Sequence, residues 1–255
     1  MVKLKNITAG YNKVEIIKNI NITFEEGSIT SIIGKNGCGK TTLLKTASNL
    51  LKPFKGEITI RGKDISYIPQ KELAKMVSFL PQFRNVPNIT VYNLVMHGRY
   101  PYLGFSRTPH KKDKEIVMNA IENLGLKNYI NKNVHELSGG QRQKVYIAMI
   151  LAQDTDIIFL DEPTTHLDIN HQLEILEVIK NLKKMGKTVV MVLHDLNSAL
   201  SSSGRVCLME KGEIVIYDTP QVVFESGEID RVFKISSTQV FNEDEGKKQY
   251  LFYLE

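Results

Sequence analysis

Residues 28–51 read SITSIIGKNGCGKTTLLKTASNLL, and three kinds of local pattern follow one another in this stretch. The β-branched run 28–33 predicts a strand, glycines stand at positions 34, 37 and 39, and residues 42–51 have the composition of a helix. A glycine-rich loop that lies between a strand and a helix and ends in Lys-Thr is the context in which a phosphate loop binds a nucleotide. We therefore predict a phosphate loop within an α/β protein.

The predicted loop offers several contacts to phosphate. Glycines let the backbone amides curl inward, and the N-terminus of the following helix adds a favourable dipole. Lys40 is expected to neutralise the β- and γ-phosphates, Thr41 to ligate Mg²⁺, and Thr42 to bond a phosphate oxygen. The nucleotide-binding residues expected here are Gly34, Lys35, Asn36, Gly37, Cys38, Gly39, Lys40, Thr41 and Thr42. The alternative is a glycine-rich turn that only caps a buried helix.

An apolar run at Ile157–Leu160 is followed directly by Asp161 and Glu162. Open α/β sheets bind ligands at the carboxyl ends of their strands, so two carboxylates there are expected beside the phosphates. We expect Asp161 to hold Mg²⁺, and Glu162 to polarise the attacking water and accept its proton. A solvated strand end is the alternative interpretation.

The remaining apolar patterns outline the fold class. Further strands are predicted at Lys3–Ile7, Ile20–Phe24 and Glu57–Ile60, and non-alternating runs at Met76–Leu80 and Thr188–Leu193 are typical of parallel strands buried on both faces. We predict an α/β fold: a phosphate-loop NTPase core with a mainly parallel central sheet, an N-terminal antiparallel β subdomain and an inserted helical subdomain. The chain is expected to be one domain, with residues 1–82 and 155–255 forming the core and residues 83–154 the helical subdomain.

Several local elements follow from periodicity and turn chemistry. Two helical faces are predicted, one at Ile116, Val117, Ala120, Ile121 and Leu124 and one at Leu173, Leu176, Ile179 and Leu182. Glu210-Lys211-Gly212 predicts a hairpin turn, Thr219-Pro220 a helix start, and residues 238–241 and 250–254 a second hairpin.

The pentapeptide LSGGQ at residues 137–141 precedes a helical pattern, so Ser138 is predicted to be a helix N-cap. This pentapeptide is identical to the signature of ATP-binding-cassette (ABC) proteins, and it lies between the phosphate loop and the acidic strand as in that family. The resemblance spans nearly the whole chain. It implies that Ser138, Gly139, Gly140 and Gln141 of one subunit cap the ATP held by another, so that the catalytic unit is a homodimer using ATP and Mg²⁺.

Four further residues match the family pattern by their order along the chain. Tyr11 resembles the aromatic residue that stacks on adenine, and Gln82 the glutamine that senses Mg²⁺ and the membrane partner. His194 resembles the switch histidine that contacts the γ-phosphate. Asp168 resembles the aspartate of the loop that crosses the dimer interface, or else caps a helix, and His166 departs from the Ser or Asn common there. Alone, each would be an ordinary structural residue.

The segment GRYPYLG at residues 98–104, together with TTHLD at 164–168, resembles importers of iron-siderophore, haem and vitamin B12 type. The resemblance implies an ATPase that works below two membrane-spanning permease subunits, at the cytoplasmic face of the membrane, with an extracytoplasmic binding protein delivering cargo. Iron-siderophore import is the function expected. Haem or cobalamin import, a soluble ABC ATPase of the iron-sulfur-assembly kind, and a nucleotide-gated module without turnover remain alternatives.

Composition agrees with a peripheral protein. The chain has 255 residues, 42% of them apolar, and no apolar run approaches the roughly 18 residues of a membrane helix. The formal charge of +5 is modest and the lysines are dispersed, so nucleic acid is not expected as a partner. The N-terminus shows no secretory pattern, and the two cysteines, Cys38 and Cys207, are expected to be reduced thiols.

Overall fold

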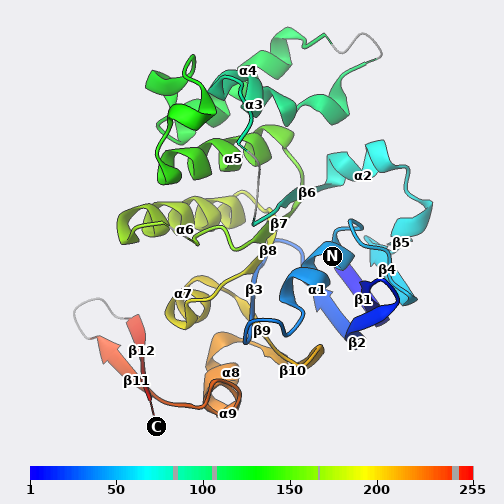
Figure 1. The fold of residues 1–255 in the computed structure, drawn as a ribbon, viewed down its shortest axis with the longest axis vertical. Coiled ribbons are helices and arrows are strands. Elements are labelled where there is room, and N and C mark those ends of the chain that lie inside the picture. Colours follow the sequence, from blue (N-terminus) through cyan, green and yellow to red (C-terminus); the bar gives the residue numbers. More distant parts are fainter. Residues whose placement is uncertain (83–85, 105–107, 166, 243–246, 255) are drawn as a thin grey trace. The chain divides into compact units, whose positions relative to one another are not determined.

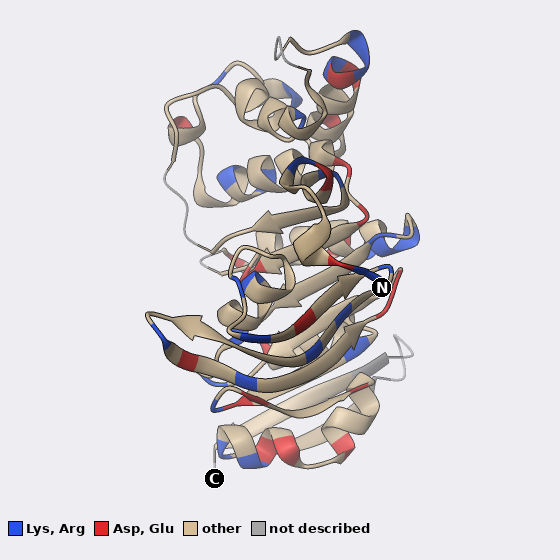
Figure 2. Ribbon diagram, turned by 90° about the vertical axis from the view of Figure 1, so that its right-hand side faces the viewer, with Lys and Arg blue, Asp and Glu red and all other residues tan. Residues whose placement is uncertain are grey.

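A computed structural model of the chain describes residues 1–82, 86–104, 108–165, 167–242 and 247–254. It divides into two compact units, Met1–Tyr67 with Lys180–Glu255, and Ile68–Ile179. Each unit is described by itself (Figure 1). Basic and acidic residues are interspersed along the described strands and helices (Figure 2). Among the described residues, no helix is both long and apolar enough to cross a bilayer.

The first unit begins with a four-stranded sheet in the order β2-β1-β4-β5. Its strands are β1 (Val2–Tyr11), β2 (Val14–Phe24), β4 (Lys55–Ile60) and β5 (Lys63–Asp64). Every neighbouring pair is antiparallel. The predicted N-terminal antiparallel sheet is therefore confirmed, with β1 and β2 longer than the apolar runs suggested.

The same unit contains four strands of the central sheet, in the order β10-β9-β3-β8. They are β3 (Ile29–Ile33), β8 (Thr188–Val192), β9 (Arg205–Glu210) and β10 (Glu213–Asp218). β3 runs parallel to both β8 and β9, and all residues of β3 and β8 are buried. The non-alternating apolar run predicted this burial for β8, whereas β3 also buries Thr30 and Ser31. β9 and β10 form the predicted hairpin. Helix α1 (Lys40–Ala47) follows β3 after the glycine-rich loop.

The C-terminal part of this unit combines three short helices with a hairpin. They are α7 (Leu196–Ser202), α8 (Pro220–Glu225), α9 (Glu228–Phe233), β11 (Ile235–Asn242) and β12 (Lys247–Leu254). Thr219 caps α8 by accepting a bond from the Val222 amide, which confirms the predicted helix start. Tyr250 of β12 packs on Phe224 of α8 with ring centroids 4.7 Å apart, so the hairpin is attached to the helices by aromatic contact.

The second unit holds two parallel strands and most of the helices. The strands are β6 (Val77–Leu80) and β7 (Ile157–Asp161). The helices are α2 (Gln70–Met76), α3 (Val91–His97), α4 (Lys111–Asn123), α5 (Gly139–Gln153) and α6 (Ile169–Lys184), the last of which ends in the first unit. Between residues 86 and 154 the described regular elements are α3, α4, α5 and three 3₁₀ turns, together with one isolated β-bridge between Thr90 and Asn133.

One predicted helical face needs correction. Leu173 is 60% exposed, whereas Leu176, Ile179 and Leu182 are buried as predicted and Ile175 is buried with them. The apolar stripe of α6 is centred on Ile175, Leu176, Ile179 and Leu182, which leaves Leu173 at its margin near the start of the helix.

The segment at residues 98–104 packs against neighbouring helices of the second unit through Arg99. Arg99 is only 5% exposed, its Nε donates to Asp113 Oδ1 at 3.0 Å, and its Nη1 donates to the Ala152 carbonyl at 2.8 Å. Its guanidinium carbon also lies 3.9 Å from the ring centre of Tyr102. Burial alone would raise the pKa of Asp113, but hydrogen bonds from the His110 amide and from Arg99 outweigh it and hold that pKa below its usual range. This network joins α4 to the C-terminal part of α5.

We expect Arg99→Met to destabilise the protein by roughly 3–5 kcal/mol, because it leaves the Asp113 carboxylate buried without its cation. Lys75→Met is the matched control, since it breaks the half-exposed Lys75–Glu72 pair of 2.8 Å and is expected to cost less than about 1 kcal/mol. Urea denaturation followed by circular dichroism measures both. Equal shifts in the two midpoints would contradict the structural role of Arg99.

Candidate functional site

The glycine-rich loop between β3 and α1 is folded around the side chain of Lys40. Lys40 is 6% exposed, and its Nζ donates to the carbonyls of Gly34 at 2.7 Å and Lys35 at 3.1 Å. The ammonium group therefore sits inside the curl of the loop, held by the loop's own carbonyls. A cation enclosed by backbone at a helix N-terminus is suited to bind an anion such as phosphate.

A turn of the β9–β10 hairpin braces this loop from outside. The Gly212 amide donates to the Cys38 carbonyl at 3.0 Å, and the Lys18 amide of β2 donates to the Gly212 carbonyl at 2.9 Å. A side chain at Gly34 would place its Cβ 2.3 Å from the Met209 carbonyl oxygen, so the loop and β9 approach too closely for any residue but glycine.

Both cysteines of the chain are free and buried. Burial raises the pKa of the Cys38 thiol, and it also raises the pKa of the Cys207 thiol on β9. Cys38 therefore stays a neutral, compact side chain within the loop, and both thiols are reduced as expected.

We expect Gly37→Ala to weaken ATP binding at least about tenfold, the effect of losing one charge-assisted hydrogen bond. Gly37 has a φ of +79°, and nothing lies within 4 Å of the position that a Cβ would take. An alanine held at this φ costs about 1 kcal/mol, and relief of that strain turns the loop amides away from the phosphates. Gly62 is a matched control, because it also has φ of +79° with nothing near its Cβ position, but it lies in the β4–β5 turn. Thermal unfolding should show that Gly62→Ala destabilises the protein as much as Gly37→Ala does. Fluorescent-nucleotide titration should show that Gly62→Ala leaves the ATP affinity unchanged. If Gly37→Ala and Gly62→Ala lost ATP affinity equally, Gly37 would have no specific role in binding the nucleotide.

His194 lies at the same sheet edge as the loop. β3 and β8 are parallel neighbours whose register pairs Ile32 with Val192, so Gly34 and His194 each follow two residues beyond that pair. The Leu193 amide donates to the Ile32 carbonyl at 3.2 Å, which continues the pairing towards the edge. His194 is exposed there. The structure therefore brings the predicted histidine and the start of the phosphate loop to one edge.

Tyr11, the other predicted residue of this unit, is the last residue of β1 and is 43% exposed. The turn that follows it is tight, since a Cβ at Gly10 would overlap the Val14 carbonyl. Its position at the end of a strand and its exposure make Tyr11 accessible for stacking.

In the second unit, the acidic pair and Gln82 meet at the carboxyl edge of two parallel strands. Leu80 of β6 pairs with Leu160 of β7, and Gln82 and Glu162 each lie two residues further on. Gln82 Nε2 donates to Glu162 Oε2 at 2.5 Å. Asp161, the last residue of β7, is 2% exposed. The parallel strands thus bring Gln82 to the acidic pair, although it lies 80 residues from Glu162 along the chain.

Two features of Glu162 were not predicted. Its φ of +52° is unusual for a residue other than glycine, and a strained backbone of this kind often orients a side chain at a functional site. Thr165 Oγ1 donates to Glu162 Oε2 at 3.0 Å, so the same carboxylate oxygen accepts from both Thr165 and Gln82. The spacing of Thr165, three residues after Glu162, was the one feature of the sequence that could have suggested this contact.

The signature pentapeptide begins α5 as predicted. Ser138 Oγ accepts from the Gln141 amide at 3.3 Å, and Gln141 Oε1 accepts from the Ser138 amide at 3.1 Å. These reciprocal bonds form a capping box, and they confirm Ser138 as the N-cap.

Asp168 caps α6, which is one of the two roles considered for it, and its role at a dimer interface stays a prediction. Its Oδ1 accepts from the His171 amide at 2.9 Å in the first turn of α6, and both carboxylate oxygens lie 2.8 Å from His171 Nδ1. The hydrogen bond from the His171 amide, and then that from its side chain, holds the pKa of Asp168 below its usual range. The carboxylate remains exposed. His166 lies outside the described residues.

The predicted site residues thus fall into two groups. The first unit contains the phosphate loop, Tyr11 and His194, and the second contains Gln82, the acidic pair, the signature and Asp168. Among the described residues, no group of three or more His, Cys, Asp or Glu could hold a metal by itself. A cation here would need other oxygen ligands besides carboxylates.

A phosphate loop between a buried parallel strand and a helix, in a sheet whose other strand ends carry polar residues, defines an α/β phosphate-loop nucleotide-binding protein. A family model described as ABC transporter matches residues 17–165. The chain belongs to the ABC transporter family. It is accordingly an ATP-binding ATPase cassette, as the phosphate loop and the signature predict.

Its relatives include importer subunits. The petrobactin import ATP-binding protein FpuD of Bacillus anthracis is 41% identical, over 91% of this chain and 85% of that protein. The iron(3+)-hydroxamate import ATP-binding protein FhuC of Bacillus subtilis is 40% identical over 96% and 91%, respectively. Among solved structures, a dimeric bacterial ABC transporter cassette superposes with a TM-score of 0.76 at 31% identity, covering 86% of this chain and 99% of that one.

Proposed function

We propose that this chain is the ATP-hydrolysing subunit of an importer for iron-siderophore complexes, bound to the cytoplasmic face of the membrane through a separate permease. The observation that carries the proposal is the identity of about 40% with siderophore-import ATP-binding proteins over at least nine-tenths of the chain. The segment at residues 98–104, which resembles importers of this type, supports the same assignment.

The phosphate loop and the acidic pair divide the chemistry. Lys40 and the loop amides bind and neutralise the β- and γ-phosphates, and Tyr11 stacks on adenine. Glu162 accepts a proton from the attacking water, and its orientation is set by the bonds from Gln82 and Thr165. His194 contacts the γ-phosphate from the neighbouring strand end.

The expected Mg²⁺ ligands have suitable chemistry. Thr41 of the first unit offers a hydroxyl, and Asp161 and Gln82 of the second unit offer carboxylate and amide oxygens, the hard ligands that this ion prefers. Phosphate oxygens would complete the coordination. When bound, the ion neutralises the charge that develops on the phosphates.

Two copies of the chain are proposed to act together, as the dimeric cassette among its structural neighbours does. Ser138, Gly139, Gly140 and Gln141 of one copy would cap the ATP held by the loop of the other. ATP binding would close the dimer against two permease subunits, and hydrolysis would reset it. An extracytoplasmic binding protein would deliver the cargo.

The proposal is tested by deleting the gene and measuring uptake of iron-labelled hydroxamate and catecholate siderophores, haem and labelled cobalamin. Loss of siderophore uptake, restored by the wild-type chain and not by Glu162→Gln, would support it. Loss of haem or cobalamin uptake alone would show that the cargo is haem or cobalamin and not a siderophore. A chain that fractionates away from membranes, with all uptake unaffected by its deletion, would instead indicate a soluble ABC ATPase.

A further inference from the structure

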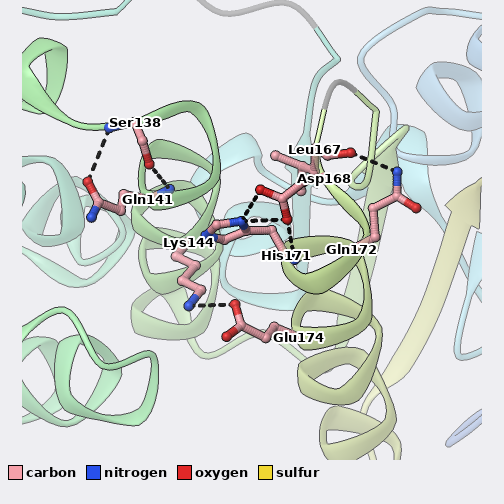
Figure 3. A network of polar contacts seen from close by, with 8 residues as sticks. All are labelled: Ser138, Gln141, Lys144, Leu167, Asp168, His171, Gln172 and Glu174. Carbon is pink, nitrogen blue, oxygen red and sulfur yellow. Dashed lines mark hydrogen bonds and ion pairs between the residues drawn. The ribbon is translucent and has the colours of Figure 1, made fainter.

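His171, in the first turn of α6, connects two segments of the proposed nucleotide site. Its Nδ1 lies 2.8 Å from both carboxylate oxygens of Asp168, and its amide donates to Asp168 Oδ1 at 2.9 Å (Figure 3). A carboxylate only accepts, so Nδ1 carries the donated hydrogen. The rotamer of the imidazole ring is thereby set by Asp168.

The other side of the ring covers the backbone of Gly140. A Cβ at Gly140 would lie 2.5 Å from Cδ2, 2.6 Å from Cγ and 2.8 Å from Nε2 of His171, so the imidazole fills the place of a side chain. Gly139 differs, because a Cβ there would meet nothing within 4 Å. Of the two signature glycines, Gly139 has open space at its Cβ position, while a side chain at Gly140 would have to displace the imidazole of His171.

Two more contacts fix the same region. Gln172 Nε2 donates to the Leu167 carbonyl at 2.9 Å, and Lys144 of α5 pairs with Glu174 of α6 at 2.7 Å (Figure 3). The first bond holds the Leu167–Asp168 segment on α6, and the second joins α5 to α6 one turn beyond His171. Only His171 contacts both Gly140 and Asp168 among the residues drawn.

We propose that His171 is a positioning residue that locks the Leu167–Asp168 segment to the first turn of α5, so that both segments move as one body onto the nucleotide of a second copy. The proposal rests on the proposed function, since it assumes that the signature and Asp168 act across a dimer interface. A rigid pair of segments closes at a lower entropic cost than two segments that must be ordered separately.

His171 makes two contacts that substitutions can separate, the hydrogen bond to Asp168 and the packing on Gly140. His171→Asn keeps a hydrogen-bond donor near the position of Nδ1 and loses the ring over Gly140. His171→Phe keeps a ring over Gly140 and loses the bond to Asp168, and His171→Ala loses both. All three leave the phosphate loop intact, so ATP binding to the monomer should not change.

The test measures ATP-dependent dimer formation in a Glu162→Gln parent, by analytical ultracentrifugation over a range of ATP concentrations. We expect His171→Ala to raise the ATP concentration for half-maximal dimer about tenfold, a usual size for coupling between sites, with Asn and Phe in between. Glu174→Gln is the control: it removes a partly exposed ion pair between the same two helices, one that contributes little and touches neither Gly140 nor Asp168, so this variant should dimerise like the parent. If the alanine variant fails to fold, the Asn and Phe variants carry the test.

A second measurement tests the contact with Gly140. Gly140→Ala should lower the urea midpoint of the chain, because its Cβ displaces the imidazole. Adding His171→Ala should restore part of that loss, since the space is then free. Additive effects would overturn the packing half of the proposal.

The outcomes also separate the two proposals. A parent that dimerises with ATP while His171→Ala dimerises at the same ATP concentration overturns the role of His171 alone. A parent that stays monomeric at saturating ATP overturns the proposed function and the lock together.

Discussion

Replacing Glu162 with glutamine is expected to lower steady-state ATP hydrolysis by at least about a hundredfold, the usual contribution of a general base, while ATP stays bound. The amide cannot take the proton of the attacking water, but it can still accept the hydrogen bonds that Gln82 and Thr165 give to Oε2. The side chain should therefore keep its place and lose only its basicity. Phosphate release measures turnover, and gel filtration with ATP detects the trapped dimer.

A control is available on the surface of α4. Glu115 has a side chain that is 60% exposed and lies 3.9 Å from Lys111, so Glu115→Gln removes a carboxylate without touching the site. Its turnover should match that of the wild type. If Glu162→Gln also hydrolysed ATP at the wild-type rate, another residue would have to accept the proton.

Lys40→Ala is expected to weaken ATP binding between roughly tenfold and a hundredfold, the worth of a hydrogen bond to a charged group. The ammonium is the only cation that the described loop encloses, and it is already held at 2.7 Å from the Gly34 carbonyl, so little ordering is needed when phosphate arrives. Fluorescent-nucleotide titration in the Glu162→Gln background measures the affinity without turnover.

Lys45→Ala is the matched control, because Lys45 lies in the last turn of the same helix. It should bind ATP as the parent does. Since Lys40 also bonds two loop carbonyls, thermal unfolding of both variants must show whether the loop itself has been lost. An unchanged affinity for Lys40→Ala in a folded protein would contradict the phosphate-loop interpretation.

The sequence predicted most of the local structure because the relevant forces are local. Buried parallel strands such as Ile157–Asp161 and Thr188–Val192 contain nearly continuous apolar runs, and caps such as Ser138 need a short polar side chain at one position. These patterns are legible without any long-range information. Leu173 was wrongly placed on the buried face of its helix, because periodicity alone does not show where the edge of a helical face lies.

The parts that could not be predicted depend on contacts between distant segments. Arg99 reads as a surface residue in the sequence, and only the meeting of α4 and α5 with the segment at 98–104 buries it. Thr165 and His171 are ordinary residues until the fold brings the first to Glu162 and the second to Gly140. Nucleotide contacts by Tyr11, His194 and the signature remain predictions.

The turn at Glu210-Lys211-Gly212 also bears on protein engineering. Hairpin turns are usually chosen as sites for tags or inserted domains, because an added loop there rarely disturbs the fold. Here the Gly212 amide bonds Cys38, its carbonyl bonds Lys18, and a Cβ would overlap the Ile16 carbonyl. An insertion at this turn would thus be felt at the ATP-binding loop, although the two are far apart along the chain. The turn at Gly62, whose Cβ position is open, is the safer place for a label.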